Sequence, residues 1–154
     1  MVRAVLAGDR SVCHYQGGGW LRYLKAKFGK DCPMIDSIPA LGSGIAYRRP
    51  FREELFRRPG EVDFLEITIE HFLDMPAHVT EELGRLKEKF VLIPHGLNLS
   101  IGSAEGLNAE YVDKVASFVN DLEPPYWSEH IAFTSAGGVD VGHLAPLPFS
   151  KEAV

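Results

Sequence analysis

Residues 62–96 decide the fold: they read VDFLEIT (62–68), then an amphipathic segment, then VLIPHG (91–96). The two apolar runs have the length of β-strands. The segment between them carries its apolar residues at helical spacing on one face: Val79, Leu83, Leu86 and Phe90. A strand, a helix and a second strand in this order indicate a parallel βα unit with a right-handed crossover.

The same alternation extends to both sides of this unit. Upstream, an apolar run at 42–47 precedes a short helix that begins near Pro50 and ends before Pro59. Downstream, Asn108 is a suitable N-cap for another amphipathic helix, which leads to a fourth apolar run at 126–133. The pattern predicts about four βα units. The expected fold class is therefore α/β, with a parallel sheet that is open or part of a barrel.

The two ends of the chain depart from this pattern. Residues 1–41 hold a Gly-rich run and one amphipathic segment at 20–28, and we expect them to form an N-terminal extension or cap to a domain at 42–154. At the other end, Ser150 is a suitable N-cap for a helix that the chain enters in its last four residues. Because one helical turn is not stable alone, we expect the chain to be truncated.

Length and composition describe an ordinary globular protein. The chain has 154 residues, 45% of them hydrophobic and 24% charged. A complete eight-stranded α/β barrel takes about 250 residues, so any barrel here is partial. The net charge of −5 offers no basic surface for nucleic acid or an anionic membrane, and the charge-free run at 90–104 is too short and too polar for a membrane helix. Two cysteines without a CxxC motif favour a cytoplasmic location.

Functional side chains of parallel α/β proteins gather at the carboxyl ends of the strands. His95 directly follows the apolar run at 91–94, where a neutral imidazole either binds a metal ion or forms a hydrogen bond to the backbone. Glu129 lies inside the apolar run at 126–133, and a carboxylate there is costly to bury unpaired. We expect its partner to be a metal ion or the cation of an Arg or Lys side chain.

Three further residues at strand ends are candidates for the same site. Glu66 either binds a metal ion or holds a neighbouring side chain by hydrogen bonds, and His71 is a ligand, a helix-start residue or an exposed side chain. Strand alternation places His130 on the face opposite Glu129, which favours a supporting or packing role. Glycine motifs for phosphate and the GxSxG motif are absent. The remaining His and carboxylate set suits iron, manganese or zinc.

Five motifs follow one another between residues 42 and 154: DFLEI (63–67), PHGLNLSIGS (94–103), EP (123–124), SEH (128–130) and LAPLPF (144–149). Together they resemble the multinuclear non-heme iron-dependent oxidative enzymes, a family long catalogued as a domain of unknown function that includes the methanobactin-biosynthesis oxygenase. The combination of the motif at 94–103 with SEH is fairly specific for that family.

The resemblance implies the N-terminal half of a TIM (β/α) barrel of the xylose-isomerase-like type, with two or three iron ions. Such enzymes use dioxygen to modify residues of ribosomally made precursor peptides, often with a small partner protein that presents the peptide. His95 and Glu129 match family metal ligands. Many members also have a His at the position of Thr68, within E-V-H-x-E-N, where His71 would have to supply a ligand from a shifted position.

Two other interpretations are open. In the first, the same side chains hold another divalent metal ion in a TIM-barrel isomerase or hydrolase, which activates water or a sugar hydroxyl. In the second, the chain is a non-catalytic half-barrel whose open outer strand edges pair with another chain or with a second copy. On the oxidative interpretation, we expect the 154-residue chain to be inactive alone.

Overall fold

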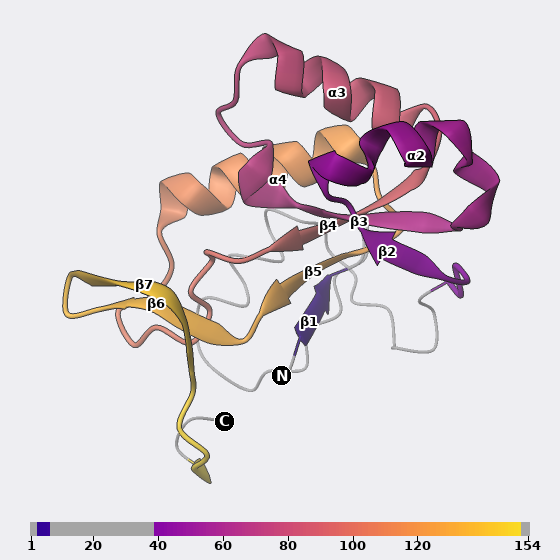
Figure 1. The fold of residues 1–154 in the computed structure, drawn as a ribbon. Helices are drawn as coiled ribbons and strands as arrows, with labels where there is room; N and C mark the ends of the chain where they lie inside the picture. Colours follow the sequence, from indigo (N-terminus) through magenta and orange to yellow (C-terminus); the bar gives the residue numbers. More distant parts are fainter. Residues whose placement is uncertain (1–2, 7–38, 152–154) are drawn as a thin grey trace.

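The computed structural model describes residues 3–6 and 39–151, and Figure 1 shows their arrangement. Five strands form one sheet in the order β1-β5-β4-β3-β2, and two further strands form a hairpin. The strands of the sheet are β1 (Arg3–Leu6), β2 (Gly44–Ala46), β3 (Phe64–Thr68), β4 (Val91–Gly96) and β5 (Trp127–His130). Strands β2 to β5 run parallel to one another, which confirms the expected α/β fold class. The four-stranded parallel sheet is compatible with part of a TIM-like barrel.

The helices follow the predicted periodicity. They are α2 (Arg52–Arg57), α3 (Ala77–Lys87) and α4 (Ala109–Leu122), with short 3-10 helices η2 (Arg49–Phe51), η3 (Pro59–Glu61) and η4 (Ile69–His71). The side chain of Asn108 accepts a hydrogen bond from the backbone N–H of Tyr111 at 3.2 Å, which confirms the predicted N-cap. Figure 1 shows all three α-helices on the same side of the sheet.

The core lies between the sheet and these helices. Strand β3 alternates between buried Leu65 and Ile67 and half-buried neighbours, as expected for a strand with one face against the core. Leu65 and Ile67 pack with Leu86 of α3, whereas Trp127 of β5 packs with the apolar face of α4. The side chains that alternate with these point to the opposite face of the sheet.

The fourth predicted strand differs from expectation. The apolar run at 126–133 is broken at Ile131, and the chain between this run and the helix expected from Ser150 forms a hairpin of β6 (Ala132–Ala136) and β7 (Val139–Pro146). Gly137 and Gly138 both have positive φ, 61° and 75°, which suits the tight turn between two antiparallel strands. In Figure 1 this hairpin projects away from the helices.

One of the two outer edges of the sheet differs from the expectation of open edges. Strand β1, from the stretch expected to form an extension or cap, pairs antiparallel with β5, with Arg3 opposite His130. The outer edge of β5 is therefore covered, whereas β2 is an edge strand of the sheet. The helix predicted at 20–28 and the end of the chain after residue 151 lie outside the described residues. Among the described helices, none is long and apolar enough to cross a membrane.

Candidate functional site

A row of polar side chains runs across the carboxyl ends of three parallel strands. In the strand register, Thr68 of β3 lies beside His95 of β4, and His95 lies beside Ser128 of β5. Register partners in a parallel sheet place their side chains on the same face. These residues alternate with the core-facing Ile67 and Trp127, so the row lies on the face that the α-helices do not cover.

Two imidazoles meet in this row. The Nε2 atoms of His95 and His130 lie 2.9 Å apart, and the ring centroids are 4.7 Å apart with an interplanar angle of 68°. Both side chains are buried, with 5% and 6% exposure. The Nδ1 atom of His95 lies 2.8 Å from the Ser128 hydroxyl oxygen. If Ser128 accepts the Nδ1 proton, the Nε2 lone pair of His95 points at His130.

The imidazole pair fits part of a metal site. A first-row metal ion binds imidazole nitrogen at about 2.0–2.1 Å, so neighbouring nitrogens on one ion lie roughly 3 Å apart, close to the distance between His95 and His130. The hydrogen bond at Nδ1 of His95 is the contact that orients a metal-binding imidazole. Within residues 3–6 and 39–151, however, no three His, Cys, Asp or Glu side chains converge as a metal-binding group.

Glu129 has a different environment from the two histidines. It lies on the face of β5 that carries Trp127 and is fully buried. One carboxylate oxygen accepts the backbone N–H of His130 at 2.7 Å, and the other accepts that of Leu99 at 3.4 Å. The pKa of Glu129 is raised to about 8: burial is the main cause, the negative charge of Glu70 acts in the same direction, and the hydrogen bonds from His130 and Leu99 oppose both. A side chain at Gly96 would collide with this carboxylate, since a Cβ there lies 2.3 Å from Oε2.

Glu70 forms a second carboxylate centre beside the turn after β4. Its Oε1 atom accepts the backbone N–H groups of Leu97 at 2.8 Å and Asn98 at 3.0 Å, and the hydroxyl of Tyr111 at 2.6 Å. Burial, and then the hydrogen bond to Glu70, raise the pKa of the Tyr111 hydroxyl. The other oxygen, Oε2, is buried without a hydrogen-bond partner among the described residues.

The structure brings only some of the predicted site residues together. His95 and His130 are in contact, and Glu129 hydrogen-bonds to the backbone of His130. Glu66 is half-buried, two positions before Thr68 on the same face of β3. His71 is exposed in η4.

Three residues of the site have roles that the sequence alone does not predict. Ser128 was recognisable only as a polar residue at a strand end, and Glu70 as one of several acidic ones. Tyr111 lies on the apolar face of α4, so the helical spacing predicts that its ring packs against the core. The same spacing does not predict the hydrogen bond from its hydroxyl to Glu70. The signal for Glu70 is its position two residues after β3, at the end of the sheet where His95 lies.

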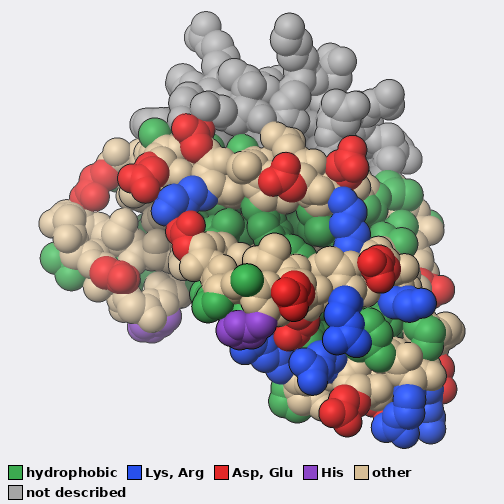
Figure 2. Space-filling model, turned by 90° about the horizontal axis from the view of Figure 1, so that it is seen from above, with side chains coloured by type: hydrophobic (Ala, Val, Ile, Leu, Met, Phe, Trp, Pro, Cys, Tyr) green, Lys and Arg blue, Asp and Glu red, His purple; other side chains and the backbone are tan. Residues whose placement is uncertain are grey.

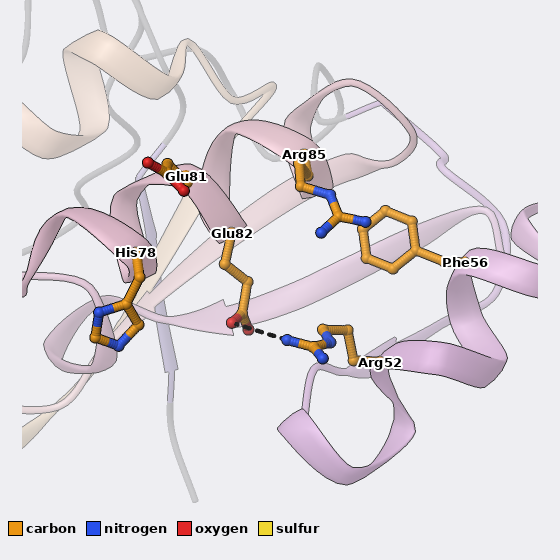
Figure 3. A pocket seen from close by; sticks show the side chains of 6 residues that line it. All are labelled: Arg52, Phe56, His78, Glu81, Glu82 and Arg85. Atoms are coloured by element: carbon orange, nitrogen blue, oxygen red, sulfur yellow. Dashed lines mark ion pairs between the residues drawn. The ribbon is translucent and has the colours of Figure 1, made fainter.

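A hollow of about 150 Å³ lies elsewhere, between α2 and α3 (Figure 3). It is lined by Arg52, Phe56, His78, Glu81, Glu82 and Arg85. Arg52 forms an ion pair with Glu82 at 3.7 Å, and the guanidinium of Arg85 lies 5.0 Å from the centre of the Phe56 ring. Its lining comes from helices alone, so it is separate from the row at the strand ends. Figure 2, seen from above, shows Lys and Arg side chains lying among Asp and Glu side chains.

Comparison with known proteins gives a consistent result. Residues 42–154 match the family described as "RiPP precursor modification enzyme MbnB/TglH/ChrH", where RiPP denotes a ribosomally made, modified peptide. A UPF0276 protein of Acinetobacter baylyi is 32% identical over 114 residues, which is 74% of this chain and 39% of the relative. A UPF0276 protein of Rhizorhabdus wittichii is 28% identical over 113 residues, 72% of this chain and 41% of the relative.

A third relative also matches most of this chain. A UPF0276 protein of Streptomyces avermitilis is 32% identical over 128 residues, covering 78% of this chain and 26% of its own length. The chain therefore spans about 40% or less of the length of these relatives. The matched region contains all the strands and helices that carry the row at the strand ends.

Proposed function

The chain belongs to the MbnB/TglH/ChrH family of RiPP precursor modification enzymes, and on that premise we propose that it contributes to an iron-dependent site for oxidative modification of a precursor peptide. The observation that carries the proposal is the imidazole pair at the strand ends, in which the Nε2 atoms of His95 and His130 are 2.9 Å apart. Imidazole is a ligand that iron shares with zinc, copper and nickel.

In this proposal His95 and His130 hold the metal ion. Glu66, on the same face of β3 as Thr68, is the nearest candidate for a carboxylate ligand by strand alternation. Both oxygens of Glu129 accept backbone N–H groups, so we assign this side chain a role in holding the backbone. It stays a candidate metal ligand only because it matches a ligand position in the family motif. Further ligands are needed, since the described residues supply no group of three.

An iron ion held by these residues would supply the activation of dioxygen that oxidation of a peptide side chain requires. The protein residues have separate tasks. The Ser128 hydroxyl holds the His95 ring through Nδ1 and so directs Nε2 toward His130. Burial of both rings keeps water away from the nitrogens. Thr68, at the position where many family members have His, offers only a neutral hydroxyl, which is a weak ligand for iron.

The hairpin is tied to the turn that follows His95. The Gly102 N–H donates to the Ala132 carbonyl at 2.9 Å, and the Thr134 N–H donates to the Ser100 hydroxyl oxygen at 2.9 Å. We therefore propose that β6 and β7 flank the entry of an extended precursor peptide to the strand ends. A small protein that presents the peptide completes the proposed assembly, and a cytoplasmic location is proposed with it.

The metal assignment is tested by titration of the anaerobically purified 154-residue chain with Fe²⁺. We expect His95→Ala and His130→Ala each to lower Fe²⁺ affinity at least about tenfold, as loss of a ligand does. His78→Ala is the matched control, because His78 is exposed on α3 and lies in the separate hollow. Equal losses in all three variants would contradict the assigned site.

The choice between oxidative chemistry and other metal chemistry needs a second measurement. Purified under anaerobic conditions, the chain is expected to carry iron, and peptide oxidation by the assembled enzyme is expected to require both iron and dioxygen. An isomerase or hydrolase is favoured if iron-free protein recovers full activity with zinc. A non-catalytic half-barrel is favoured if no metal ion binds at all.

A further inference from the structure

We propose that Glu70 is a positioning residue, which fixes the turn after β4 and thereby the placement of His95 at the strand ends. The functional meaning of this inference rests on the proposed metal site, whereas the geometry does not. The carboxylate of Glu70 reaches from η4 to residues 27, 28 and 41 positions later in the chain. No residue of the turn itself supplies these contacts.

The turn presents its backbone N–H groups to two carboxylates. Glu70 accepts those of Leu97 and Asn98, at 2.8 and 3.0 Å, and Glu129 accepts that of Leu99, at 3.4 Å. Three consecutive amides are thus held from two different strand ends, immediately after the His95-Gly96 end of β4. The two hydrogen bonds to Glu70 fix the amides of Leu97 and Asn98 relative to η4.

Tyr111 donates a third hydrogen bond to the same oxygen, Oε1 of Glu70. Its hydroxyl donates to Glu70 Oε1 at 2.6 Å from the first turn of α4, while its ring packs against the core cluster around Trp127. One oxygen atom therefore ties together η4, the turn after β4 and the start of α4. These three segments surround the end of β4 on which His95 lies.

The unpartnered oxygen of Glu70 supports a role beyond packing. Oε2 is buried with no hydrogen-bond partner among the described residues, and such an acceptor lowers stability. An apolar side chain at position 70 would avoid this cost, so the buried carboxylate calls for an explanation. The structure supplies one: the three donors on Oε1 are all groups that set the course of the chain leaving His95.

The test uses the 154-residue chain without metal and then with Co²⁺ as a probe. In metal-free protein, Glu70→Ala is expected to speed amide hydrogen exchange at Leu97 and Asn98 at least tenfold and to shift the imidazole ¹⁵N resonances of His95. Glu70→Gln keeps one carbonyl acceptor and should restore most of both signals. With Co²⁺, the Ala variant should bind at least tenfold more weakly than the Gln variant.

Two matched variants keep the inference falsifiable if Glu70→Ala fails to fold. Tyr111→Phe removes one donor from Oε1 and should shift the His95 resonances in the same direction by a smaller amount. Tyr126→Phe, at a half-buried tyrosine with no hydrogen bond among the described contacts, should leave them unchanged. A purely structural role predicts a lower melting temperature with unchanged His95 resonances, and that result would overturn the inference. If the unaltered chain fails to bind Co²⁺, the proposed metal site is wrong, yet the exchange and resonance data still decide the role of Glu70.

Discussion

His95 and Ser128 are 33 positions apart in the chain, and strand register joins them at 2.8 Å through Nδ1 and the hydroxyl oxygen. This contact uses Nδ1 of His95, and Nε2, the other ring nitrogen, faces His130 at 2.9 Å. The Ser128 hydroxyl can donate or accept, and in either role it holds the ring of the imidazole that we assign to the metal ion in a fixed orientation.

Removal of the Ser128 hydroxyl is therefore expected to weaken metal binding without loss of the fold. Ser128→Ala should lower Fe²⁺ affinity about 10- to 100-fold, the usual effect of losing the group that orients a ligand. Ser103→Ala, in the loop before α4, is the control and should leave the affinity unchanged. Isothermal titration under anaerobic conditions measures both. Unchanged affinity in Ser128→Ala would show that the hydroxyl does not orient the ligand.

Thr68 offers a test by gain of function. The register places it beside His95 on the same face, and many members of the resembled family have a His at this position. Thr68→His should place a third imidazole next to the pair. We expect Fe²⁺ affinity to rise at least about tenfold, because each additional bond from an imidazole to the metal ion contributes to binding. Thr80→His, exposed on α3, adds the same side chain away from the pair and should have no effect. A lower affinity in Thr68→His would contradict the assigned site.

The regular elements of the fold follow from local patterns. The alternation of β3 and the helical spacing before β4 are set by which side chains face the core, so they are visible in the sequence. Gly137-Gly138 is a local signal for the turn of the hairpin, but the apolar run at 126–133 continues across the break at Ile131 and hides where β5 ends and β6 begins. Strand β1 was missed because its pairing with β5 joins segments that are far apart in the chain.

In the candidate site, too, some features follow from local sequence and others depend on contacts between distant residues. Position at a strand end identified His95, Glu129 and His130, and alternation placed the last two on opposite faces. Which face carries the proposed metal ligands depends on the side of the sheet that the helices cover, and that is a tertiary property. The partners of the side chains, such as Tyr111 for Glu70, depend on contacts between residues 41 positions apart. Neither relation has a periodic signature.

The buried carboxyl group of Glu129 predicts an unusual pH dependence of stability. Burial raises its pKa to about 8 in the folded state, whereas the ordinary value of 4.5 applies on unfolding. Between these values the folded state binds more protons than the unfolded state, so the free energy of unfolding falls as the pH rises. This contribution is complete below about pH 4.5 and is lost as the pH rises through about 8.

Chemical denaturation of metal-free protein at a series of pH values measures this effect. Glu129→Gln mimics the protonated side chain and should remove much of the decline between pH 5 and 8, a change on the order of a few kcal/mol. Glu81→Gln, at an exposed position on α3, should keep the decline of the unaltered chain. Parallel curves for all three proteins would mean that Glu129 is ionised in the fold at neutral pH.

Gly96 provides a steric test of the Glu129 environment. A Cβ at position 96 would lie 2.3 Å from Oε2 of Glu129, closer than unbonded atoms can approach. Gly96→Ala should therefore lower the free energy of unfolding by about 1–3 kcal/mol, as overpacking of a core does. Gly84→Ala is the control: nothing lies within 4 Å of a Cβ there, and Ala in the middle of α3 should stabilise the protein by about 0.5–1 kcal/mol.

In the double variant Gly96→Ala with Glu129→Ala, the collision is gone, so the loss of stability caused by Gly96→Ala should be smaller. An undiminished cost in that background would place the strain somewhere other than the carboxylate, because the two substitutions would then act independently.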